Sequence, residues 1–167
     1  MEIRLANPGD DTLEISKIYA QSWKAAYKGI VPQKYLDSLP EDRWAFKLTQ
    51  SAFHSMLVIE DGSYIGTSSF GAAREEEWAG WAEIISIYLL PEVFGRGIGG
   101  QLLGAVLTEL SHIGYHKVYL WVLEGNARAR RFYETHGFRC LGEAKDIEIG
   151  GKLLQELRYV CEIRLAL

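Results

Sequence analysis

The chain has 167 residues, enough for one domain with a buried core and too few for two of ordinary size. Its formal net charge of -4 argues against nucleic acid as a partner, because such binding needs clustered Lys and Arg to neutralise phosphates. The start, MEIRLANPGDD, lacks the apolar segment of a signal peptide, and no apolar run approaches the length of a membrane span. We therefore expect a cytoplasmic protein, with Cys140 and Cys161 as reduced, buried thiols.

No metal site is expected from the histidines. His112 and His116 are four residues apart, but Gly114 lies between them and the carboxylate of an H-E-x-x-H motif is missing. We interpret both as solvated or locally bonded side chains.

Hydrophobic periodicity predicts the elements of the first half of the chain. Asp10 or Asp11 is placed to cap the first helix, and Asp61-Gly62 to form a hairpin turn. The predicted elements, in order, are a strand at 2–6, a helix at 12–27, two short helical pieces within 30–50 that begin near Pro32 and Pro40, and strands at 56–60 and 64–71.

The second half continues the alternation of helices and strands. After an acidic stretch at 74–77, expected to be a solvated loop, the pattern predicts strands at 81–90 and 117–123, helices at 98–113 and 126–136, and final strands at 138–143 and 147–165 around a Gly150-Gly151 turn. Strands 81–90 and 117–123 lack a polar face, which is typical of central strands. The order predicts a single α/β domain over residues 1–167, with a mixed central sheet flanked by helices.

The segment PEVFGRGIGGQLL, residues 91–103, holds four glycines within six residues at the start of a predicted helix. Glycine costs backbone entropy, so such a cluster indicates that another group comes close to the backbone. At a helix start, unpaired N–H groups and the positive end of the helix dipole favour a phosphate. Four glycines exceed what a tight turn needs for packing alone, so we predict a cofactor that contains phosphate.

A glycine-rich loop before a helix can bind the diphosphate of a dinucleotide cofactor or that of a different cofactor. Gly95, Gly97 and Gly100 fit the G-x-G-x-x-G fingerprint of a nucleotide-dependent oxidoreductase. That fold needs the fingerprint in its first strand–turn–helix unit and a carboxylate about 20 residues further on. Here the loop lies beyond residue 90, and too few residues remain for the crossovers of such a sheet. The oxidoreductase therefore stays a less favoured alternative.

Two motifs in the second half resemble those of the GNAT superfamily of N-acetyltransferases. The family's acetyl-CoA loop reads Q/R-x-x-G-x-G/A, and Gly97 and Gly99 match its glycines, whereas Phe94 stands at the leading Gln or Arg position. The family's downstream pattern N-x-x-A-x-x-F-Y-x-x-x-G-F is matched by Asn126, Ala129, Phe132, Tyr133, Gly137 and Phe138.

The resemblance implies acetyl-CoA as co-substrate. In the family, two neighbouring parallel strands splay apart and pantetheine inserts between them; here these would be 84–90 and 117–123. Asn126 is also expected to cap its helix. The implied acetyl-CoA contacts are Ile87, Tyr88 and Leu89 of the first strand, Gly95, Arg96, Gly97, Ile98, Gly99 and Gly100 of the loop, and Asn126 and Ala129 of the following helix.

The resemblance also implies transfer of acetyl to a primary amine by direct attack on the thioester, with Tyr133 as proton donor to the departing thiolate. A phenol and a thiol have similar reference pKa values, about 10 and 8.5. Glu83, among the apolar residues Trp81, Ile85 and Ile87, is the candidate base, because desolvation is expected to raise its pKa. Bulk water is the alternative proton acceptor.

The acceptor pocket of the family is built from the first helices and the last strand pair. Trp23, Tyr27 and Tyr159 are therefore candidates to enclose an amine by cation–π contact, with core packing as the alternative for each. The main competing function is a non-catalytic acyl-CoA-binding sensor. A homodimer is compatible with the resemblance, since dimers are common among relatives.

Overall fold

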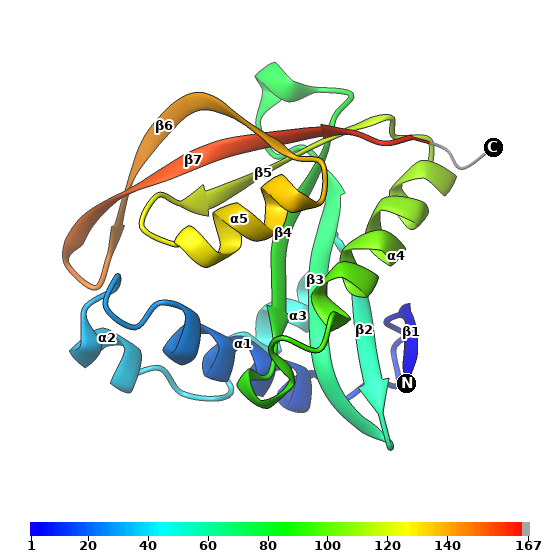
Figure 1. Ribbon diagram of the computed structural model, residues 1–167. Helices are drawn as coiled ribbons and strands as arrows, with labels where there is room; N and C mark the ends of the chain where they lie inside the picture. The colour runs from blue at the N-terminus through cyan, green and yellow to red at the C-terminus, as the bar shows by residue number, and fades with distance from the viewer. Residues whose placement is uncertain (165–167) are drawn as a thin grey trace.

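The computed structural model describes residues 1–164, which are built around a mixed sheet of seven strands in the order β1-β2-β3-β4-β5-β7-β6 (Figure 1). Neighbouring strands are antiparallel except for β4 and β5. The predicted α/β fold with a mixed central sheet is confirmed, and β4 is the middle strand. The strands are β1 (Glu2–Leu5), β2 (His54–Glu60), β3 (Ser63–Ala72), β4 (Ala82–Leu89), β5 (Lys117–Leu123), β6 (Arg139–Ile149) and β7 (Lys152–Glu162).

Helices cover both faces of the sheet. On β2, Leu57 packs with Ile15 and Tyr19 of α1, whereas Met56 and Val58 pack in the cluster that includes α4. Successive residues of a strand point to opposite faces, so α1 and α4 lie on opposite sides. The helices are α1 (Thr12–Ala26), α2 (Gln33–Asp37), α3 (Ala45–Gln50), α4 (Ile98–His112) and α5 (Ala127–Thr135), with 3₁₀ turns η1 (Glu76–Trp78) and η2 (Pro91–Val93).

Some local signals in the sequence were interpreted correctly and others were not. Asp11 caps α1, its carboxylate accepting hydrogen bonds from two backbone N–H groups of the first turn. Pro32 directly precedes α2, but residues 41–44 after Pro40 form turns rather than helix. Cys140 is exposed, so its predicted burial is wrong, because it lies on the edge strand β6.

The parallel pair of strands is short and then opens. Ala82 pairs with Val118 and Glu83 with Tyr119, at the N-terminal ends of β4 and β5. Ile84 and Ser86 of β4 pair with neighbouring residues of β3, so Ile85 between them forms a β-bulge. A bulge of this kind bends its strand. Meanwhile β5 stays paired with β7 along its whole length. The two strands therefore diverge toward their carboxyl ends, as Figure 1 shows, and the predicted splay is confirmed.

A long hairpin of β6 and β7 forms the far side of the opening. The sequence predicted a break between two strands at 144–146, which is wrong, because these residues pair with β7 as part of β6. The pairing is irregular only between Cys140 and Ala144, a stretch that contains Gly142 with a φ of +79°. Leu165, the predicted end of the last strand, lies outside the described residues. The hairpin turn reaches α2 (Figure 1), where the Lys152 ammonium donates to the Ile30 carbonyl at 3.2 Å.

The contact between this turn and α2 predicts different costs for two neighbouring substitutions. Gly150 and Gly151 both have positive φ, but a Cβ on Gly150 would lie 2.6 Å from the Tyr35 Cβ, and one on Gly151 would meet nothing within 4 Å. Gly151→Ala should therefore cost about 1–2 kcal/mol of unfolding free energy from its backbone alone. Gly150→Ala should cost more, because the hairpin must also move. Urea denaturation of both variants tests this, and equal costs would contradict it.

Candidate active site

A cavity of about 990 Å³ opens where β4 and β5 diverge. Its walls come from α1, residues 44–53, the C-terminal halves of β4 and β5, residues 93–100, α5 and the β6–β7 hairpin. Among the predicted site residues, Glu83, Arg96 and Tyr159 do not line it. The structure brings the others together there: Trp23, Tyr27, Ile87, Tyr88, Leu89, Gly95, Gly97, Ile98, Gly99, Gly100, Asn126, Ala129 and Tyr133.

Two of the loop glycines are required by backbone conformation. Gly95 and Gly97 have φ values of +79° and +76°, a region that costs other residues about 1–2 kcal/mol. Gly97 is the N-cap of α4, and no side chain caps this helix end. The N–H groups of the first turn therefore remain available at the cavity wall, where they favour an anion.

The other two glycines allow a second helix to come close. A Cβ on Gly99 would lie 3.3 Å from the ring of Phe132, and one on Gly100 would lie 2.7 Å from Nε2 of His136. Phe132 lies in the last turn of α5, and His136 directly follows the helix. The glycine cluster thus places α5, which carries Tyr133, against the first turn of α4. Asn126 caps α5 as predicted, its side-chain oxygen accepting from the Ala129 N–H at 3.1 Å.

The loop is accompanied by an arginine other than the predicted one. Arg96 forms an ion pair with Glu60 at 2.8 Å and does not line the cavity. Arg128 lines the cavity instead, with its guanidinium carbon 3.9 Å from the ring centroid of Phe94. Phe94, which departs from the family motif, therefore supports a cation by cation–π contact.

Tyr133 lies in the wall of the cavity. Its ring packs edge-on against Phe132 and Phe138 at centroid distances of 5.2 and 5.6 Å. Burial raises the pKa of Tyr133 well above its usual value, with a further contribution from Tyr88. The phenol is therefore protonated at neutral pH, as a proton donor must be.

Glu83 does not have the raised pKa that the sequence predicted. Burial does raise the pKa of Glu83, but hydrogen bonds and charge from Arg74 outweigh it, and the net shift is downward. The Arg74 guanidinium contacts the carboxylate at 2.6 and 3.1 Å, and the Tyr119 hydroxyl donates to it at 3.0 Å. Glu83 and Tyr119 also form the last residue pair between β4 and β5. These contacts therefore join the two strands at the point where they begin to diverge.

Tyr159 also lies away from the cavity. It is completely buried in the core cluster that includes α4, and its hydroxyl donates to Glu134 at 2.8 Å and accepts from the Arg130 guanidinium at 3.1 Å. These contacts give Tyr159 a role in core packing rather than in enclosing an amine.

Trp23 and Tyr27 belong to an aromatic wall on the α1 side of the cavity. Their rings meet edge-on at 4.8 Å, and Trp23 donates from Nε1 to the Tyr88 hydroxyl at 3.0 Å. Trp44 adds a further ring, 5.7 Å from that of Trp23. Burial raises the pKa of Tyr27 to about 12, so this wall is uncharged at neutral pH.

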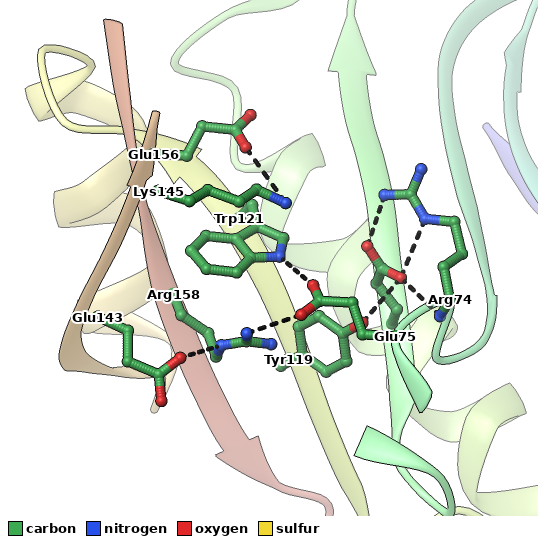
Figure 2. A network of polar contacts seen from close by, with 9 residues as sticks. Arg74, Glu75, Tyr119, Trp121, Glu143, Lys145, Glu156 and Arg158 are labelled. Atoms are coloured by element: carbon green, nitrogen blue, oxygen red, sulfur yellow. Dashed lines mark hydrogen bonds and ion pairs between the residues drawn. The ribbon is translucent and has the colours of Figure 1, made fainter. Parts of the chain in front are cut away.

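The acidic stretch at 74–77 is not a solvated loop, because two of its side chains are bound to the sheet. Arg74 pairs with Glu83, and Glu75 accepts hydrogen bonds from the Trp121 indole at 2.8 Å and from Arg158 at 2.9 Å (Figure 2). Arg158 also lies over the Trp121 ring, 4.2 Å from its centroid. These contacts fix the orientation of Trp121, a cavity residue that the sequence did not indicate.

The model of the Acetyltransferase (GNAT) family matches residues 14–138, which include the cavity loop and α5. The chain belongs to this GNAT family. The resemblance predicted from the two motifs is therefore confirmed.

GNAT relatives and solved structures agree with this membership. An uncharacterised N-acetyltransferase of Bacillus subtilis, YuaI, is 32% identical over 152 residues, covering 89% of this chain and 86% of the relative. A spermidine N(1)-acetyltransferase of Thermoplasma acidophilum is 25% identical over 154 residues, covering 90% and 92%. The structure of the PaiA N-acetyltransferase of the same organism in complex with coenzyme A superposes with a TM-score of 0.72 at 21% identity, covering 97% of this chain and 99% of that one.

The protein is thus a GNAT N-acetyltransferase. The oxidoreductase and the non-catalytic sensor are not favoured. Within residues 1–164, no helix combines the length and apolarity that crossing a membrane requires.

The contacts of Glu83 predict a stabilising role that depends on pH. The Glu83 side chain is 2% exposed and its partner Arg74 is 53% exposed. Glu83→Gln removes the negative charge that strengthens these hydrogen bonds, so we expect the unfolding free energy to fall by about 1.5–3 kcal/mol at pH 7. The folded-state pKa of Glu83 is lowered, so this stabilisation is complete above the unfolded pKa of about 4.3 and disappears as the pH falls through the folded value.

Urea denaturation of wild type and Glu83→Gln between pH 7 and pH 3 measures this difference. The exposed neighbour Glu77, changed to Gln, is the control and should leave stability unaltered. A difference that grew toward acid pH would contradict the assigned ion pair.

Proposed function

We propose that the protein transfers acetyl from acetyl-CoA to a primary amine by direct attack of the amine on the thioester, with Tyr133 as proton donor. The observation that supports this most strongly is that one cavity combines the uncapped start of α4, the open edge of β4 and the Tyr133 hydroxyl.

The residues at the loop fit the phosphates of acetyl-CoA. In this proposal the backbone amides of residues 96–100 bind the diphosphate, and Arg128 adds a positive charge beside them. Pantetheine lies along β4, whose residues 87–89 pair with β3 on one side and have no β5 partner on the other. A backbone N–H of this open edge polarises the thioester carbonyl.

The chemistry then requires two proton movements. The neutral amine forms a C–N bond with the acetyl carbon, the C–S bond breaks, and the Tyr133 hydroxyl gives its proton to the thiolate sulfur. A proton lost from the new amide nitrogen returns to Tyr133.

Deprotonation of the incoming ammonium is assigned to water in the cavity. Glu83 lacks both the raised pKa and the position for this step, because its carboxylate is bound by Arg74 and Tyr119 outside the cavity lining. A cytoplasmic location, a homodimer and a reaction without metal stay predictions.

Binding of acetyl-CoA and the role of Arg128 can be tested by thermal unfolding. Acetyl-CoA at 100 times its Kd should add about 2.7 kcal/mol of stability, and NAD should add none. Arg128→Ala should weaken acetyl-CoA binding about tenfold, since a charge-assisted contact to phosphate is lost. Arg131, an exposed arginine of the same helix, is the control. Stabilisation by NAD instead of acetyl-CoA would refute the proposed function.

The proton-donor role of Tyr133 predicts a defect in turnover without one in binding. Tyr133→Phe should lower kcat about a hundredfold or more while leaving the acetyl-CoA-induced stabilisation intact. Release of thiol from acetyl-CoA with a panel of primary amines is the assay, and Tyr115→Phe, outside the cavity, is the control. Unchanged kcat would show that another group supplies the proton.

A further inference from the structure

The charges on the cavity wall are unevenly distributed. Among residues 1–164, the Lys, Arg, Asp and Glu side chains that line the cavity are Lys47, Arg74 and Arg128 and a single acidic residue, Glu156. Cations suit the phosphates of acetyl-CoA, and they repel an acceptor that carries an ammonium group. Attraction of such an acceptor by an opposite charge in this lining therefore depends on Glu156.

Glu156 lies on β7, between Leu123 of β5 and Lys145 of β6 in the sheet. Its side chain is 18% exposed. Burial raises the pKa of Glu156, and the nearby positive charges, with Lys145 the foremost, offset that effect in part. The positive charges near Glu156 therefore do not fully offset its burial, so a further favourable contact with a cation would stabilise the carboxylate.

The structure already holds a primary ammonium group at this place. The Lys145 Nζ lies 3.7 Å from a Glu156 oxygen and 4.1 Å from the centroid of the Trp121 ring (Figure 2). A carboxylate beside an indole face is a combination that binds ammonium groups well. The Lys145 side chain is 45% exposed, so it can leave this place for solvent.

Trp121 is held in the orientation that this contact needs. Its indole N–H donates to Glu75, and Arg158 lies over the ring from the side away from Lys145 in Figure 2. The ring therefore stays in place whether or not Lys145 is present.

We propose that Glu156 and Trp121 form the subsite for an ammonium group of the acceptor, which displaces the side chain of Lys145. This inference rests on the proposed function and names its acceptor class: amines that are positively charged at neutral pH, in preference to neutral or acidic ones. Displacement exchanges one ammonium for another, so the charge beside Glu156 is unchanged. No covalent step is involved.

The subsite predicts opposite effects for its two charged residues. Glu156→Gln should weaken binding of a cationic amine about tenfold or more, because the ion pair is lost. Lys145→Met should strengthen binding several-fold, because an internal competitor is removed. Glu148→Gln is the matched control, since Glu148 is an exposed carboxylate of the same hairpin that does not line the cavity.

Calorimetric titration of spermidine, n-butylamine and lysinamide into the protein saturated with coenzyme A measures these affinities without turnover. Thiol release then supplies KM and kcat for whichever amine binds, and Glu156→Gln should raise KM with little change in kcat. Equal affinities in wild type and Glu156→Gln would overturn the subsite, and so would weaker binding by Lys145→Met.

The titration also separates this inference from the proposed function. If wild type binds acetyl-CoA but none of the three cations, the ammonium subsite is wrong and acetyl transfer to another acceptor class stands. If acetyl-CoA itself fails to bind, the proposed function fails before the subsite is reached.

Discussion

The structure depends most on the separation of two parallel strands. β4 and β5 share two residue pairs, after which the bulge at Ile85 turns β4 away while β7 keeps β5 straight. A continuous parallel sheet would satisfy the backbone groups of both strands and leave no space between them. The divergence opens the cavity and exposes the edge of β4 to it. The Glu83, Arg74 and Tyr119 contacts hold the strands at the point of separation, so a buried charged group has a structural task there.

The glycine loop shows how one short segment meets two requirements. Gly95 and Gly97 adopt positive φ, which shapes the turn into α4. Gly99 and Gly100 lack the side chains that would collide with α5. The same glycines thus leave the helix start open and bring Tyr133 to it, so the proposed acetyl-CoA-binding loop and the proposed proton donor are coupled by packing.

Features that depend on local sequence were predicted well. The alternation of helices and strands, the caps at Asp11 and Asn126, and the glycine loop with its downstream motif all follow from residues close together in the chain. Features that depend on contacts between residues far apart along the chain or on different strands were not predicted. The pKa of Glu83 is set by Arg74, which a loop of nine residues folds back onto it. Glu156 and Lys145 meet through the register of β6 on β7, and a stretch of polar residues hid the continuity of β6.

The wall between α2 and the β6–β7 hairpin joins segments from opposite ends of the chain, as the bond between Lys152 and Ile30, 122 residues apart, illustrates. Contacts of such separation carry a high loop-closure entropy and form late, whereas the loop and helices between Pro91 and Thr135 close over short distances. The two halves of the cavity therefore differ in contact order. On this basis we expect residues 91–135 to assemble before the wall between α2 and the β6–β7 hairpin, and we expect that wall to open locally more readily than the centre of the sheet.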